Sequence, residues 1–178
     1  MGFTPKLAYA LDECDHLSRS EPAMGDALEA ILSRLLQAVE DDAGGELMAS
    51  VLLIDDSGER LLHGAAPSLP KAYCDAIHGI AIGPNVGSCG TAAYLGHPVY
   101  VSDIADDVLW AEYAALAAEH GLRACWSTPI EDAVGQLVGT FAIYYRTPRS
   151  PAPVELQAIR LIASRVAEVI VRARGQRA

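Results

Sequence analysis

The chain has 178 residues, 51% of them hydrophobic, which is enough for one compact domain with a buried core and too few for two domains of ordinary size. Its 13 basic and 23 acidic residues give a net charge of −10, which argues against partners such as nucleic acid or an anionic membrane surface. The first residues lack the basic start and apolar run of an export signal, and no apolar stretch is long enough to span a bilayer. We therefore expect a cytoplasmic protein.

The first half of the chain predicts a helix followed by a β-hairpin. Apolar residues from Met24 to Val39 recur at spacings of 3 and 4, which is typical of a helix with one buried face. The β-rich run Glu46 to Ile54 is followed by the turn "DDSGER" and the second strand "LLHGAA". The segment "LPKAYCDAIHG" then predicts a short helix that ends at Gly79.

The second half predicts a strand, a helix, a second hairpin and a long final helix. The strand is "HPVYVSD", about five residues, and the helix "WAEYAALAAEHG" ends at Gly121. The segments "LRACWSTPIED" and "LVGTFAIYYR" form the hairpin, and the final helix runs from Pro153 to about Arg174. Strands in the middle and helices at the ends predict an α+β fold, a mostly antiparallel sheet with helices on one face.

The glycine-rich stretch "GPNVGSCGTAAYLG", residues 83 to 96, is the most unusual local feature. It has no lysine for a phosphate-binding P-loop, lacks the G-x-G-x-x-G spacing of a dinucleotide site, and departs by one residue from a G-x-S-x-G nucleophile turn. Glycines permit close backbone approach, and Thr91 to Leu95 predict a short helix. We interpret this stretch as the edge of a pocket.

Three segments resemble the GAF domain family, in the branch common in bacterial signalling proteins. They are "GSCGTAAYLGHPVYVSDIADDVLW", "HGLRACWSTPI" and "GQLVGTFAIYYRTPR", and the resemblance runs from about Met24 to the C-terminus. It implies a six-stranded antiparallel sheet, with the terminal helices on one face and a small-molecule pocket on the other. We assign residues 1–22 to a helical extension, 23–174 to the GAF domain and 175–178 to a tail.

Members of this family bind cyclic nucleotides, haem, bilins, nitrate and other effectors, so the fold alone does not identify a ligand or cofactor. Neither Cys89 nor Cys125 stands in the Asp- and His-containing context of bilin attachment. The four cysteines show no zinc-type spacing, and we expect no metal ligand among the histidines, which fall mostly at predicted turns or element ends. The histidines are His16, His63, His78, His97 and His120.

Free methionine sulfoxide reductases are GAF proteins with a cysteine in a similar G-x-C-G loop, which Cys89 matches. Their chemistry also needs a second cysteine in the segment after the next strand, and Ser102 to Arg123 contains none. We therefore expect Cys89 to be a packing residue and the protein not to be an enzyme. The reductase remains one alternative, and a dimerisation module with an empty pocket is another.

Alternation along the second hairpin places Cys125 and Ser127 on one face of the sheet, and we expect Thr140 to join them toward the pocket. Trp110 and Tyr113 form either a lid or part of the ordinary core. With the glycine-rich stretch, the predicted ligand-binding residues are Cys89, Thr91, Trp110, Tyr113, Cys125, Ser127 and Thr140.

The final helix carries apolar residues at heptad spacing, which favours a seam with a second chain. The alternative is that this seam and the neighbouring apolar face both belong to the domain core. The segment Leu7 to Leu17 is expected to join the same helical interface. We thus predict a homodimeric sensory domain that binds a small-molecule effector and signals through its terminal helices to a fused or separate kinase, cyclase or transcription module. The seam residues are Ile159, Ile162, Val166, Val169 and Ala173.

Overall fold

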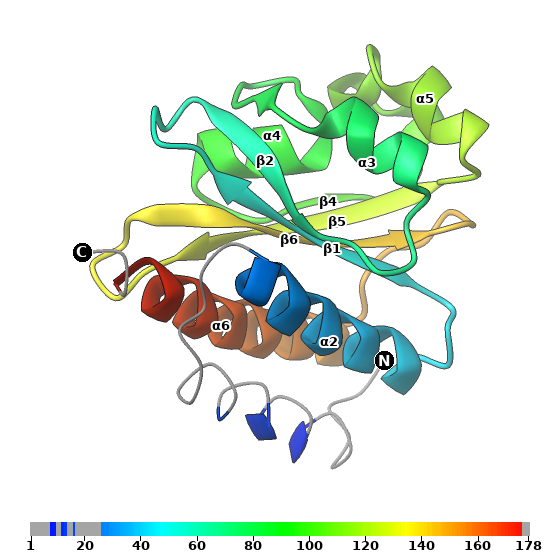
Figure 1. Cartoon of the computed structure of the whole chain (residues 1–178). Helices are drawn as coiled ribbons and strands as arrows, with labels where there is room; N and C mark the ends of the chain where they lie inside the picture. Colours follow the sequence, from blue (N-terminus) through cyan, green and yellow to red (C-terminus); the bar gives the residue numbers. More distant parts are fainter. Residues whose placement is uncertain (1–7, 10–11, 14–15, 17–25, 176–178) are drawn as a thin grey trace.

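A six-stranded antiparallel sheet forms the centre of the computed structural model, which describes residues 8–9, 12–13, 16 and 26–175 (Figure 1). The strand order is β3-β2-β1-β6-β5-β4, with the long strands β6 and β5 near the middle. The α+β prediction is confirmed, although β3 has only two residues and no local pattern predicted it. The strands are β1 Met48–Ile54, β2 Arg60–Ala65, β3 Ile80–Ala81, β4 Val99–Val101, β5 Ala124–Glu131 and β6 Leu137–Tyr145.

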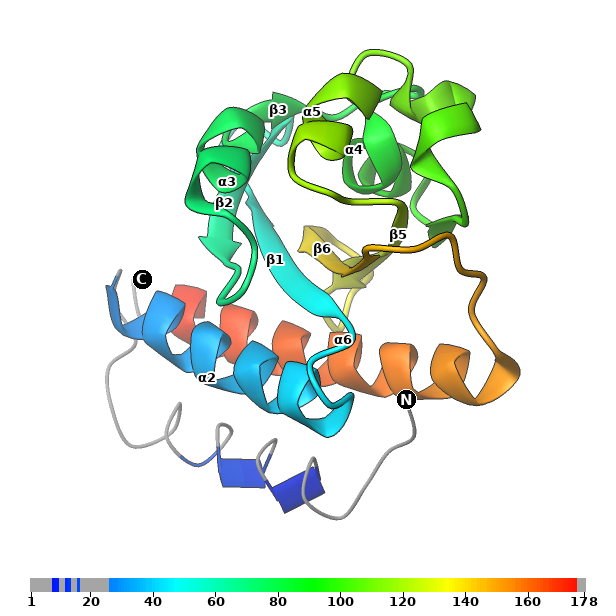
Figure 2. The ribbon, with the colours of Figure 1, turned by 90° about the vertical axis from the view of Figure 1, so that its right-hand side faces the viewer.

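Helices cover both faces of this sheet. The long helices α2 (Asp26–Asp42) and α6 (Pro153–Gly175) lie side by side on one face, as Figures 1 and 2 both show. Short elements cover the other face: α3 (Lys71–Ile77), α4 (Gly87–Leu95), α5 (Ala114–Glu119) and the 3-10 turns η1 (Ile104–Asp106) and η2 (Val108–Trp110). Among the described residues, no helix is long and apolar enough to cross a membrane.

The alternation of side chains divides the apolar interior into two cores. Trp126, Phe141 and Tyr145 point toward α2 and α6 and belong to the first core. Cys125 and Tyr144, their neighbours along the strands, point the other way into the second core, under α3, α4 and η2. Because successive strand residues face opposite sides, one hairpin supplies both cores.

The prediction that five residues of α6 form a seam with a second chain is wrong. All five residues are buried in the first core, and the exposed fractions of Val166 and Val169 are 0% and 2%. The neighbouring face of α6 is largely buried there too, so the alternative, that both stripes belong to the domain core, is correct. A helix that packs on a sheet and on a second helix needs a broad apolar face, and heptad spacing alone does not say which neighbour covers it.

The start of α6 agrees with the prediction. Pro153 is its first residue, and the preceding Ala152 occupies the cap position. The carboxylate of Glu155 accepts a hydrogen bond of 2.8 Å from the Ala152 N–H. It also forms an ion pair with the guanidinium of Arg149, at 2.9 Å. One half of a capping box is therefore present without the hydroxyl that would complete it.

Several predicted boundaries differ from the structure. Helix α4 begins at Gly87 rather than Thr91, and β4 has three residues rather than five. The helix expected to start at Trp110 is divided, because Trp110 ends η2 and only Ala114–Glu119 is α-helical. The predicted helix start at Met24 lies outside the described residues.

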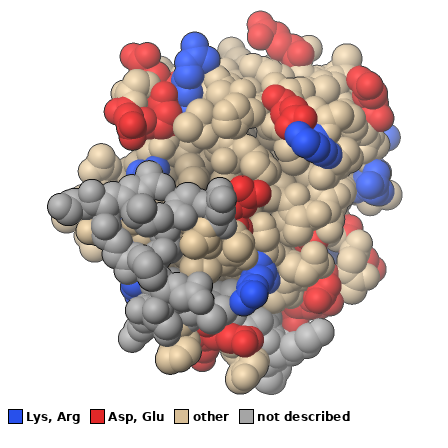
Figure 3. Space-filling view, viewed as in Figure 1, with Lys and Arg blue, Asp and Glu red and all other residues tan. Residues whose placement is uncertain are grey.

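Only part of the predicted segment Leu7 to Leu17 is described. Residues 8–9, 12–13 and 16 are helical, and Asp12 lies 3.7 Å from Arg165 of α6 in an ion pair. On the face drawn in Figure 3, acidic and basic side chains are interspersed, and no basic patch gathers there.

Candidate functional site

The glycine-rich stretch forms a tight loop that leads directly into α4. A Cβ on Gly90 would lie 2.6 Å from the Cβ of Val86 and 2.9 Å from the Ala81 carbonyl oxygen, so only glycine fits there. The Thr91 hydroxyl accepts a hydrogen bond from the Val86 N–H (3.2 Å) and donates to the Pro84 carbonyl (3.4 Å). Gly90 and Thr91 thus shape the loop that holds the start of α4 against the sheet.

A small cavity lies between the sheet and the elements α3, α4 and η2. Its volume of about 20 Å³ is room for about one water molecule. One side is the sheet, and the rest is formed by side chains of the short elements. The lining residues are Leu52, Tyr73, Ile77, Ile80, Val86, Gly87, Ser88, Cys89, Trp110, Tyr113 and Tyr144.

A hydrogen-bonded chain closes one wall of the cavity. The indole N–H of Trp110 donates to the hydroxyl of Ser88 at 3.1 Å, and that hydroxyl donates to the carbonyl oxygen of Cys125 at 3.0 Å. The Trp110 ring is buried and rests against the backbone of Gly87. Through this chain η2 is joined to α4 and α4 to β5.

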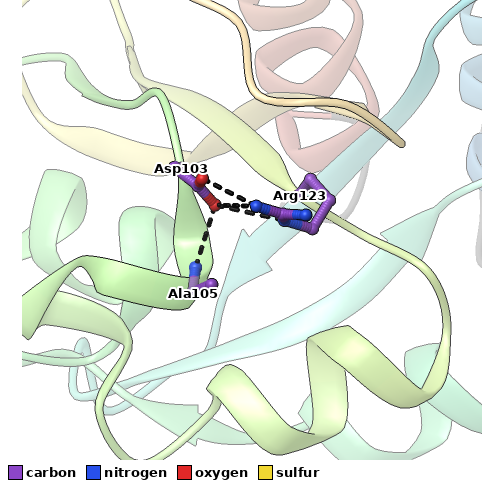
Figure 4. A network of polar contacts seen from close by, with 3 residues as sticks. All are labelled: Asp103, Ala105 and Arg123. Atoms are coloured by element: carbon purple, nitrogen blue, oxygen red, sulfur yellow. Dashed lines mark hydrogen bonds and ion pairs between the residues drawn. The ribbon is translucent and has the colours of Figure 1, made fainter.

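An ion pair anchors the segment that carries Trp110 (Figure 4). Asp103 follows β4 and Arg123 precedes β5, and the guanidinium donates hydrogen bonds of 2.7 to 3.1 Å to both carboxylate oxygens. The Asp103 carboxylate also accepts from the Ala105 N–H at 3.2 Å. The hydrogen bonds from Arg123 lower the pKa of Asp103, so this anchor is ionised at neutral pH.

Two buried cysteine thiols lie next to each other, Cys89 in the lining of the cavity and Cys125 beneath it. The Cys89 sulfur lies 3.9 Å from the Tyr144 hydroxyl, and Tyr144 is the cross-strand partner of Cys125. Hydrogen bonding from the Cys125 thiol is the largest cause that lowers the pKa of Cys89 to about 7, and the hydroxyls of Ser127, Tyr144 and Thr140 add to it against the opposing effect of burial. Burial and the neighbouring Cys89 raise the pKa of Cys125. Near neutral pH, Cys89 is therefore the thiol of the pair that ionises.

The sheet floor beside these thiols contains unpaired hydroxyls. Ser50 and Ser127 flank Ala142 on the neighbouring strands, and Thr140 lies two residues away on β6. All three are buried, and their hydroxyl oxygens have no hydrogen-bond partner among the described residues. Ser127 and Thr140 nevertheless lie close enough to Cys89 to stabilise its thiolate. A buried hydroxyl without a hydrogen-bond partner lowers the stability of the fold, so this part of the sheet face is not a fully satisfied core.

The structure brings most of the predicted ligand-binding residues together. Cys89, Trp110 and Tyr113 line the cavity. Cys125, Ser127 and Thr140 lie beneath it on the same sheet face, whereas Thr91 serves the loop and does not line the cavity. Whether any of them binds a ligand stays a prediction.

Sequence reasoning missed several lining residues, chiefly the two tyrosines Tyr73 and Tyr144. The alternation that places Thr140 on the cavity face also places Tyr144 there, so that signal was present. Tyr73 lies in a short helix with no comparable signal. Its ring packs edge-on against Tyr144, with centroids 5.8 Å apart.

Comparisons with known proteins give the same fold. The sequence model of the GAF domain matches residues 25–171. A methyl sulfide methyltransferase-associated sensor of Methanosarcina acetivorans is 41% identical over 138 residues, which is 78% of this chain and 14% of that sensor's length. This chain therefore corresponds to a small part of that protein.

Solved structures with the same fold include both sensors and enzymes. A domain described as belonging to a two-component sensor histidine kinase of Sinorhizobium meliloti 1021 is 25% identical, with a TM-score of 0.68 over 86% of this chain and 97% of that one. The GAF domain of a Coxiella burnetii phosphoenolpyruvate-protein phosphotransferase is 17% identical, with a TM-score of 0.71 over 96% of each chain. The free methionine-R-sulfoxide reductase of Neisseria meningitidis is 14% identical, with a TM-score of 0.67 over 95% of this chain and 90% of that one. The family model, which spans most of the chain, together with the six-stranded sheet and its terminal helices, shows that this chain belongs to the GAF domain family.

Proposed function

We propose that residues 23–174 form a sensory GAF domain of a signal-transduction protein, which binds a small-molecule effector in the cavity beneath α3, α4 and η2. The observation that carries this proposal is the cavity itself, with short elements in its walls and unpaired hydroxyls on the sheet face beneath it. Buried polar groups without partners are typical of sites that a ligand completes. The similarity to a sensor of Methanosarcina acetivorans supports a signalling role.

A buried carboxylate links the cavity wall to the terminal helices. Glu40, near the end of α2, accepts hydrogen bonds from the Ala49 N–H (2.8 Å) and the Ser68 hydroxyl (2.5 Å). Ser68 precedes α3, whose Tyr73 and Ile77 line the cavity. A displacement of α3 by a ligand would therefore pull on α2, and burial raises the pKa of this connecting carboxyl group.

We further propose that α2 and α6 carry the signal to an output module, whether a kinase, a cyclase or a transcription factor. The two helices lie together on the sheet face opposite α3, α4 and α5 (Figure 2). The outward face of α6 exposes Val154, Leu161 and Val171, with exposed fractions of 41% to 56%. We assign the contact between two copies of a homodimer to this face, in place of the buried seam.

Hydrogen exchange will test the location of the effector. We expect residues 71–77, 87–95 and 108–113 to exchange more slowly in protein as purified than in protein that was unfolded, dialysed and refolded, because a bound molecule holds these short elements closed. The interior of α6 around Ile162 serves as the internal reference and should not change. Equal exchange in all three segments, with protection elsewhere, would place the effector at another site.

A thiol-dependent reductase is the second candidate function, and one observation favours it. The sequence lacks a cysteine between Ser102 and Arg123, yet the structure places Cys125 against Cys89, so a pair of thiols is present. In such chemistry the thiolate would attack the sulfoxide, giving methionine and a sulfenic acid, and the second thiol would condense with it to a disulfide and water.

We expect no turnover of free methionine sulfoxide when the protein is supplied with a dithiol reductant. The substrate carries an ammonium and a carboxylate group, and none of the eleven residues that line the cavity is basic, so the carboxylate would have no counter-charge there. The measurement is the amount of methionine formed, with a known reductase as the positive control. Turnover that disappears in Cys89→Ser and in Cys125→Ser, but not in Cys74→Ser, would overturn the sensor-only assignment.

A further inference from the structure

We infer that the effector is an uncharged, mostly apolar small molecule with one hydrogen-bonding end, such as a carbonyl, amide or hydroxyl group. This inference rests on the proposed function, because it specifies the class of molecule that the same cavity takes. Three features of the cavity carry it: the absence of basic and carboxylate side chains from its lining, the polar groups at one end, and the tryptophan that closes it.

No basic or carboxylate side chain lines the cavity. Its lining consists of aliphatic and aromatic side chains, one serine, one glycine and one cysteine, with no histidine, arginine, lysine, aspartate or glutamate. The buried carboxylates of the described residues, Glu40 and Glu155, are both already hydrogen-bonded outside this lining. Cys89 is the lining group that can ionise near neutral pH, so an anion would meet no counter-charge there, and a cation would meet none below about pH 6, where this thiol is protonated. The entry of either ion then costs far more than the entry of a neutral isostere.

The polar groups of the cavity lie together where α4 packs on β5 and β6. Ser88, Cys89 and Tyr144 line this end, and the unpaired hydroxyls of Ser127 and Thr140 lie behind Cys89. The opposite walls, formed by residues such as Ile77, Ile80 and Val86, are apolar. The ligand that matches this distribution has one hydrogen-bonding end and an apolar body.

We assign to Trp110 the movement that admits a ligand. The closed cavity holds about one water molecule, so a larger ligand needs space that a lining side chain now fills. The ring is held by one side-chain hydrogen bond, to Ser88, and belongs to a three-residue turn in which Val108 is 78% exposed. Outward rotation of Trp110 would open a space of about the size and shape of an aromatic ring and would free the Ser88 hydroxyl for the ligand.

Three probes of nearly the same shape test the charge requirement: benzamide, benzoate and benzamidinium. The sequence has two tryptophans, so ¹⁵N-labelled protein gives two indole N–H signals, and Trp110→Phe identifies which belongs to Trp110. At about pH 6, where the Cys89 thiol is mostly protonated, we expect benzamide to shift the Trp110 signal with a Kd at least about tenfold lower than either charged probe. The signal of Trp126, in the opposite core, should stay in place.

A pair of threonine variants tests the hydrogen-bonding end. Thr140→Val and Thr128→Val each remove an unpaired buried hydroxyl without changing the shape of the side chain. Thr128 pairs with Phe141 and faces the helices, so it is the matched control on the other side of the sheet. Both variants should remain folded, and Thr140→Val alone should weaken benzamide binding, by about threefold to tenfold.

The outcomes separate this inference from the proposed function. A charged probe that binds as tightly as benzamide, or no shift of the Trp110 signal with any probe, would overturn the inference about ligand class. Equal weakening by both threonine variants would overturn the assignment of the polar end. Each of these results leaves the hydrogen-exchange test of the effector site standing, since that test uses whatever molecule purifies with the protein.

Discussion

Replacement of Val166 and Val169 by glutamate in the same chain is expected to unfold the domain. Both side chains are fully or almost fully buried in the core that α6 shares with α2 and the sheet. An unpaired buried charge costs several kcal/mol of folding free energy. Two such charges together cost about as much as the whole free energy of unfolding of an ordinary domain, which is roughly 5–15 kcal/mol. Far-ultraviolet circular dichroism and urea denaturation will measure the loss.

The control for this variant carries the same charges on the outward face of the same helix. Leu161 and Val171 are each 41% exposed, so Leu161→Glu with Val171→Glu should stay folded and should separate any dimer that uses that face. Light scattering reports the separation. A folded Val166→Glu, Val169→Glu variant would show that this side of α6 faces outward in solution, contrary to the structure.

Substitution of Gly139 by alanine is expected to have the second-largest effect. Gly139 lies in the central strand β6 and pairs with Leu53 of β1 and Ile130 of β5. An added Cβ would overlap the carbonyl oxygen of Leu52 and lie 3.4 Å from the Leu53 Cα, so the β1–β6 ladder would have to separate locally. We expect a loss of about 3 kcal/mol in the free energy of unfolding, measured by urea denaturation.

Gly175→Ala is the matched control for Gly139→Ala, because an added Cβ there meets nothing within 4 Å. Its unfolding midpoint should stay the same or rise slightly, since alanine favours a helix more than glycine does. An unchanged midpoint in Gly139→Ala would mean that β1 and β6 are farther apart than the structure places them.

The sequence predicted the elements whose periodicity is long and undisturbed. Helix α2 and the β5–β6 hairpin follow from spacings of 3 to 4 and of 2 over whole segments. Two-residue β3 is too short for any period, and it forms because β2 offers it a free edge. The division of the helix near Trp110 had a local signal, since Asp103 and Asp107 each accept a hydrogen bond from the N–H two residues on, as caps of short turns do.

The candidate site was predictable only where one strand or one loop supplies it. Alternation grouped Cys125 with Ser127, and the mixture of apolar and polar groups expected in a ligand site added Thr140 to their face. The contact between Cys89 and Cys125 joins residues 36 positions apart through the packing of α4 on β5, which no local pattern encodes. The prediction of a dimer contact on α6 was wrong for a related reason. Apolar spacing indicates that a helix face is buried, but it does not indicate which element covers that face.

Native mass spectrometry of protein purified from its own cells will test the central claim that the cavity binds a small molecule. We expect a mass excess over the 178-residue chain that disappears on denaturation. It should be absent from Ile80→Phe, in which a larger side chain fills the cavity wall while the fold is kept. A native mass equal to that of the bare chain, or an excess retained by folded Ile80→Phe, would contradict the account.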